Sequence, residues 1–298
     1  MNTSMQNGDN HNHDNDKDWM AVQRGVLITL GVCIVTINAT VLILFATSKR
    51  QKRIFDVLLM NQAAVDLVHG LLLVPAKLLT IWKWNIALLT YGKVVCLAHY
   101  LSAFSHFLIT AERCYAIFAI ATPLLYHAAM TNKVACKQIT AVWLSAVVLA
   151  VSPFSWWQED PTETSGNITE HYASFSAFLL LIMVILILAL AVIQFFSALK
   201  WKFKKVQNLE QCPLYGYRTK VINSIFIVCA MVLFYCITYL PTMMTAFFDI
   251  RNIHHPELKL VDVSAWAYLL TPIFNGAITV IFKFWKKMNT LHTMNGSH

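Results

Sequence analysis

The chain has 298 residues, of which 57% are hydrophobic and only 13% are charged. Average soluble domains have about 25% charged residues, so this composition argues against a cytosolic enzyme and against a disordered chain. The formal net charge of +8 does not indicate nucleic-acid binding, because the basic residues form short clusters between long apolar runs instead of one patch.

Seven apolar runs are long enough, at about 20 residues or more, to cross a bilayer as helices. In chain order they are Val26–Ala46, Phe55–Leu79, Ile86–Ala119, Ile139–Trp157, Phe175–Leu199, Val221–Phe247 and Val261–Phe284. None alternates like a strand of a membrane barrel, and no matching halves of a repeat transporter are present. The sequence therefore predicts an all-α, seven-transmembrane helix bundle over residues 23–287, with polar tails at 1–22 and 288–298.

The distribution of Lys and Arg predicts the orientation of this bundle. The connections after spans one, three and five, together with the C-terminal tail, contain 16 of the 23 basic residues. Because positive loops remain in the cytoplasm, we expect the N-terminus and residues 1–22 outside and residues 288–298 inside. Two glycosylation sequons, at Asn2 and Asn167, then lie on the outer side, where we expect them to carry glycans.

Polar residues within the spans are the first candidates for a functional site, because an ionisable group in the membrane is costly unless it is paired or hydrated. Asp66 lies in the middle of span two, and Thr271 and Asn275 share one face of span seven. Asn38 lies in span one and Ser102 in span three. A carboxylate among hydroxyl and amide oxygens suits a sodium ion or a water cluster, and no other metal is expected. The alternative is a polar network that only joins helices.

The end of span three reads Thr110-Ala111-Glu112-Arg113-Cys114-Tyr115-Ala116-Ile117, which resembles the acid-Arg-aromatic motif of the rhodopsin-like (class A) G-protein-coupled receptors. Five spans carry the hallmark residue of that family, in the family's order, namely Asn38, Asp66, Arg113, Trp143 and Pro241. The resemblance implies a multi-pass plasma membrane receptor surrounded by lipid. It also implies an extracellular ligand and a cytoplasmic cleft that admits a heterotrimeric G protein when span six moves outward.

The resemblance gives several residues a role in that switch. Arg113 is always charged, and Glu112 beside it is its expected partner at rest; the alternative is an arginine that only anchors its helix at the interface. Pro241 interrupts the hydrogen bonding of span six and favours a kink, which Tyr239 could couple to the packing below the ligand. Tyr239 is equally consistent with a core aromatic. Two further residues, Pro123 and Leu124, form an apolar knob that contacts the G protein in the family.

Departures from the family pattern keep an alternative function open. The loop of residues 158–172 has no Cys, so the family's commonest disulfide cannot form. Span seven reads Asn275-Gly276-Ala277-Ile278-Thr279 in place of Asn-Pro-x-x-Tyr, and no acid lies near Val221 to pair with Arg113. The alternative is a non-signalling membrane protein of the same fold, such as a decoy, a chaperone or a heteromer partner.

The ligand class stays open between a peptide, a lipid and another small molecule. Candidate pocket residues are His99, Tyr100, Trp156, Trp157, Trp266 and Tyr268, although aromatic residues also form interfacial belts. Leu269 stands where opsins have the retinal-binding Lys, and Val95 where amine receptors have an Asp. No catalytic motif is present, so we expect neither an enzyme nor a resident cofactor apart from the possible sodium ion.

Overall fold

The computed structural model describes residues 6–48, 53–81, 85–121, 130–155, 164–203, 213–250 and 258–295. Within these ranges the chain forms helices and no strand. The elements are α1 (Gln6–Ala46), α2 (Ile54–Val68), the π-helical turn η1 (His69–Leu73), α3 (Val74–Ile81), α4 (Asn85–Ala121), α6 (Asn132–Ser155), α7 (Thr164–Phe203), α8 (Pro213–Ile250) and α9 (Leu258–Asn295).

Seven stretches of these helices are long and apolar enough to cross a membrane, which confirms the predicted seven-span, all-α fold. They are Trp19–Ala46, Ile54–Ile81, Lys93–Ile117, Asn132–Ser152, Phe175–Trp201, Val221–Pro241 and Trp266–Phe284. The segments α2, η1 and α3 together form the second of them. Helix α1 begins at Gln6 and α9 continues to Asn295, so helical backbone extends into both predicted tails.

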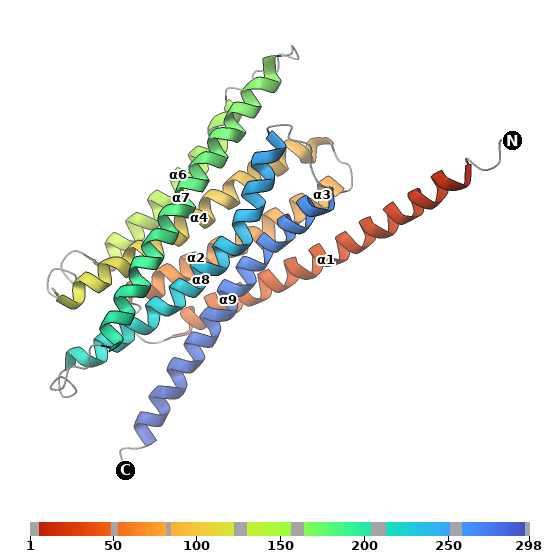
Figure 1. The fold of residues 1–298 in the computed structure, drawn as a ribbon. Coiled ribbons are helices and arrows are strands. Elements are labelled where there is room, and N and C mark those ends of the chain that lie inside the picture. The colour runs from red at the N-terminus through yellow and green to blue at the C-terminus, as the bar shows by residue number, and fades with distance from the viewer. Residues whose placement is uncertain are drawn as a thin grey trace.

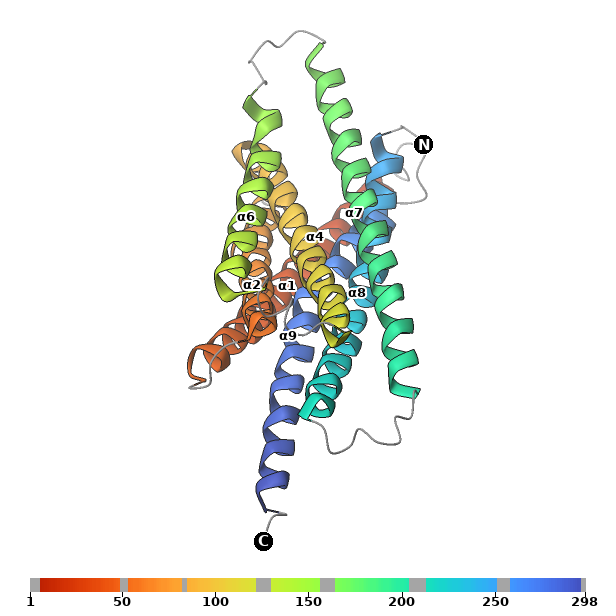
Figure 2. The ribbon, with the colours of Figure 1, turned by 90° about the vertical axis from the view of Figure 1, so that its left-hand side faces the viewer.

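Helix α4 is the central element of the bundle (Figures 1 and 2), because it packs against α2, α3, α6, α7 and α8. Helix α9 packs against α1, α2 and α8, and its C-terminal part projects beyond the other helices (Figure 1). This arrangement places α4, α8 and α9 around one shared interior.

Burial in the bundle is arranged for a lipid environment. Large apolar side chains such as Val32, Leu144 and Phe196 are more than 60% exposed. The polar residues Asn38 and Asp66 are instead at most 1% exposed. Apolar side chains are favourable on the surface that contacts lipid, whereas polar groups need hydrogen-bond partners in the interior of the bundle.

One span deviates from regular geometry next to a proline, and another contains a proline within a continuous helix. In η1 the amide of Val74 donates to the carbonyl of His69, five residues back. Pro75 follows directly, and a proline ring clashes with the carbonyl four residues before it, which accounts for the wider turn here. In α9, Pro272 lies three residues before Asn275, so span seven retains a proline one turn from where the family places it. Neither Pro75 nor Pro272 was among the predicted features of the spans.

Candidate functional site

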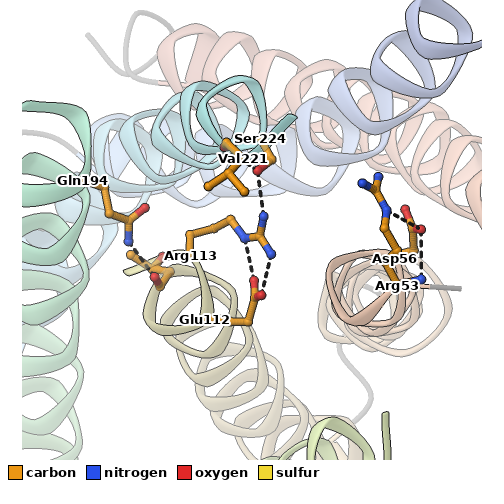
Figure 3. Close-up of polar contacts among 8 residues, drawn as sticks. Arg53, Asp56, Glu112, Arg113, Gln194, Val221 and Ser224 are labelled. Carbon is orange, nitrogen blue, oxygen red and sulfur yellow. Dashed lines mark hydrogen bonds and ion pairs between the residues drawn. The ribbon is translucent and has the colours of Figure 1, made fainter. Parts of the chain in front are cut away.

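Arg113 and Glu112 form a buried ion pair near one end of α4 (Figure 3). The guanidinium donates from Nε to Glu112 Oε2 over 2.5 Å and from Nη2 to Glu112 Oε1. Arg113 is 5% exposed and Glu112 is 1% exposed. Two parallel charge-assisted hydrogen bonds satisfy the carboxylate and neutralise the arginine within a single helix.

A third hydrogen bond connects Arg113 to α8. Its Nη1 donates to Ser224 Oγ over 2.7 Å, and Ser224 Oγ donates to the carbonyl of Val221 over 2.7 Å (Figure 3). Ser224 was not among the predicted residues, because the family pattern leads one to expect an acid, not a hydroxyl, in this region of span six. A signal was present, because Ser224 is a small polar residue at the start of an otherwise apolar run.

Asp66 lies in the middle of the bundle and accepts hydrogen bonds at both carboxylate oxygens. Gln62 Nε2 donates to Oδ1 over 3.0 Å, and Asn275 Nδ2 of α9 donates to Oδ2 over 3.3 Å. Asn38 Nδ2 of α1 donates nearby to the carbonyl of Pro272 over 3.1 Å. Gln62 was not among the predicted residues, although it lies one helical turn before Asp66 on the same face.

Three amide oxygens at this level, those of Asn38, Gln62 and Asn275, are buried without a hydrogen-bond partner in the described part of the chain. These three oxygens add acceptors without donors to the Asp66 carboxylate, which itself accepts from Gln62 and Asn275. Thr271 instead shares a 2.5 Å hydrogen bond with Thr238 of α8, and Ser102 is buried on α4. A surplus of oxygen acceptors is the donor set that a hard cation or a water cluster requires.

Toward the other end of the bundle, histidine and tyrosine rings form a continuous column, defined by His69, Tyr268, His99, Tyr239, Tyr235 and His106. Successive ring centroids are 5.3, 4.6, 5.2, 4.8 and 4.4 Å apart. The rings come from η1, α4, α8 and α9, so this column joins the helices that surround the interior. Tyr239 lies in the middle of the column, between His99 and Tyr235.

Each histidine of the column has the same local arrangement. The Nδ1 atoms of His69, His99 and His106 lie 3.0, 2.6 and 2.8 Å from the backbone carbonyl four residues earlier. A carbonyl only accepts, so Nδ1 carries the hydrogen and Nε2 is left as an acceptor. Among the described residues, no group of three His, Cys, Asp or Glu is placed to hold a metal.

The other predicted pocket residues that the structure describes, Tyr100 and Trp266, are not part of this column. Tyr100 shares a 2.7 Å hydrogen bond with Ser176 of α7 and is fully buried. Trp266 stacks on Trp19 of α1 at 5.9 Å. Five predicted residues lie outside the described residues, namely Asn2, Pro123, Leu124, Trp156 and Trp157. Asn167 is part of α7, and its side chain is also outside the described set.

Seven membrane-length helices around a polar interior, with a buried arginine joining two of them, define a membrane receptor of the seven-helix type. The family model for the 7 transmembrane receptor (rhodopsin family) matches residues 37–278. The match covers most of the chain, which therefore belongs to the rhodopsin family of seven-transmembrane receptors and is a multi-pass protein of the plasma membrane.

Proposed function

We propose that this receptor binds an extracellular ligand and activates a heterotrimeric G protein. In this proposal the N-terminus is outside, and the end of the bundle that contains Arg113 faces the cytoplasm. The observation that carries it is the contact of Arg113 with Ser224, because it joins α4 and α8 through a buried charged group. A charged side chain in a membrane helix costs free energy, and such a residue is retained where it has a function.

The switch consists of separating α8 from α4. Outward movement of α8 breaks the hydrogen bond between Arg113 and Ser224, while Glu112 moves together with Arg113 because the two are neighbours on α4. Pro241 lies inside α8 and removes one backbone hydrogen bond, which makes the helix easier to bend there. The cleft that opens receives the G protein, which Pro123 and Leu124 also contact.

The ligand acts from the opposite end, on the column of histidine and tyrosine rings and on Trp266. His99 and Tyr268 stack at 4.6 Å, and Tyr239 of α8 contacts both rings. A ligand that displaces these rings therefore moves α8 directly. The ligand is a peptide, a lipid or another small molecule, and Tyr100, Trp156 and Trp157 add to its pocket. Glycans at Asn2 and Asn167 lie on the same side of the membrane as the ligand. The protein has no enzymatic activity.

A sodium ion fits the acceptor cluster around Asp66. The carboxylate supplies the charge, and the free oxygens of Asn38, Gln62 and Asn275 supply neutral ligands, which is the oxygen set that hard cations prefer. The hydroxyls of Ser102 and Thr271 complete the polar surroundings. A bound cation would hold α1, α2 and α9 in the arrangement observed here.

The test is ligand-independent nucleotide exchange on a panel of Gα subunits, in membranes that contain equal surface amounts of each variant. Replacing Arg113 alone removes the ion-pair partner of the buried Glu112 carboxylate, so the informative variant is Glu112→Gln with Arg113→Gln. In the open bundle Arg113 is released from Ser224 and contacts the G protein, so we expect this double variant to lose exchange although it also breaks the bond to α8. Exchange equal to that of the wild type would overturn the role of Arg113.

Wild-type membranes decide between the receptor and its alternative. Exchange on at least one Gα subunit supports the proposal. No exchange on any Gα, with Ser224→Ala included to favour the open bundle, would support the non-signalling protein of the same fold.

A further inference from the structure

Arg113 has a contact with α2 that none of its hydrogen bonds requires. Its Cζ atom lies 4.2 Å from the centre of the Phe55 ring, within the range of a cation–π interaction. Phe55 is 4% exposed and Arg113 is 5% exposed, so the contact is screened from water. Cation–π interactions are strongest where both groups are desolvated.

The ring of Phe55 is itself held in place. Phe282 of α9 meets it edge to face, with ring centroids 6.3 Å apart and planes at 76°. Helices α2 and α9 also pack against each other and against α1. The ring of Phe55 is thus held by α2 and α9, whereas Ser224, to which Arg113 donates a hydrogen bond, lies on α8.

We propose that Phe55 is a positioning residue for Arg113: its ring holds the guanidinium where Nη1 reaches Ser224, and so it keeps α8 closed against α4. This inference rests on the proposed function, in which separation of α8 from α4 is the activating movement.

The physical reason is the freedom of the arginine side chain. A free arginine loses about 2 kcal/mol of rotamer entropy when it is fixed in one geometry. Glu112 fixes two of its nitrogens, but this pair can turn about the side-chain bonds of both residues because they lie on the same helix. A flat ring from α2 removes this freedom, because a guanidinium stacks on an aromatic face in one plane. Removing the ring's attraction weakens the hydrogen bond to Ser224 without touching Ser224 itself.

Fluorination of the ring tests this, because each fluorine withdraws charge from the face and weakens a cation–π contact while the shape of the side chain is nearly kept. The full-length chain in lipid nanodiscs carries phenylalanine with zero, one, two or three ring fluorines at position 55. Spin labels at Lys133 of α6 and Thr219 of α8, both exposed, report the fraction of molecules with α8 moved outward.

Phe45 provides a matched control. Its ring is 1% exposed and lies 3.7 Å from Nζ of the half-buried Lys283, so it also takes part in a cation–π contact, but one without Arg113. We expect the ratio of open to closed molecules to rise stepwise with fluorine number at position 55, by about 10- to 30-fold over the series. The same series at Phe45 should change it less than twofold.

The mechanism also predicts non-additivity. In a Ser224→Ala background the bond that Phe55 supports is already absent, so three fluorines at position 55 should change the ratio less than twofold. A ratio independent of fluorine number, or an equal rise with and without Ser224, would overturn the proposal. A stepwise rise in the distance measurement without nucleotide exchange on any Gα would leave the positioning role intact and contradict only the proposed function.

Discussion

Gly276 of α9 lies close against α1, and replacing it should separate the two helices. A Cβ atom added to Gly276 would lie 2.8 Å from Ile37 Cγ2 and 3.0 Å from Asn38 Oδ1. Neither neighbour can easily give way. Ile37 is β-branched and stiff at χ1, and the Asn38 amide is held by the carbonyls of Ile34 and Pro272.

Gly276→Ala is therefore expected to destabilise the protein by about 1–3 kcal/mol, the usual cost of overpacking a well-packed site. This corresponds to a fall in the unfolding temperature of the purified protein of about 3–10 °C. Gly25→Ala is the matched control, because a Cβ atom at Gly25 meets nothing within 4 Å. The control should be neutral, or up to about 1 kcal/mol more stable through helix propensity.

The double variant Gly276→Ala with Ile37→Ala tests the cause of the effect. Ile37→Ala removes two of the three nearest atoms, so the second substitution should recover part of the loss, and the two changes should be non-additive by at least about 0.5 kcal/mol. Equal unfolding temperatures for Gly276→Ala and Gly25→Ala would refute the close approach of α9 to α1. The short distance to α1 also explains why α9 has glycine at this position, because a side chain here would meet Ile37.

Three further substitutions follow from single contacts. Ser224→Ala removes a hydrogen bond to a charged group, which is worth about 1.5–3 kcal/mol, so ligand-independent nucleotide exchange should rise about tenfold or more. The control Ser145→Ala, on the exposed face of α6, should leave nucleotide exchange unchanged. Asp66→Asn should abolish the rise in unfolding temperature that sodium chloride gives over choline chloride at equal ionic strength; a wild type indifferent to the choice of salt would exclude the ion. Trp143→Phe removes the 2.9 Å hydrogen bond from Trp143 Nε1 to Asn61 Oδ1 and should cost about 1–3 kcal/mol in a thermal unfolding assay, and no loss would mean that water replaces this bond.

The spans could be predicted from sequence because hydropathy is a local property. Each of the seven runs contains enough apolar residues to identify it without knowledge of its neighbours. The ends could not be predicted equally well. Helix α1 begins at Gln6, twenty residues before the predicted start at Val26, because polar residues can continue a helix beyond the apolar run.

Contacts between helices could be predicted only where the type of a single residue indicated them. Asp66 and Arg113 were found because a charge inside a membrane span is conspicuous. Ser224, Phe55 and Gln62 were missed because a serine, a phenylalanine and a glutamine are ordinary in such helices. Their importance comes from the rotation of α8 and α2 about their own axes, and no local pattern in the sequence specifies those rotations relative to α4.

The hydrogen-bond acceptor on α8, Ser224, also determines the free energy that is needed to separate α8 from α4. An ion pair between α4 and α8 would require two opposite charges to separate in a low-dielectric interior, which is costly. Here the charge of Arg113 is neutralised by Glu112, which stays on the same helix when α8 moves. Opening therefore breaks one hydrogen bond to a neutral hydroxyl, worth about 1.5–3 kcal/mol. Because the interhelical bond that is lost is small compared with an ion pair, we expect measurable basal exchange and a large relative response when Ser224 is removed.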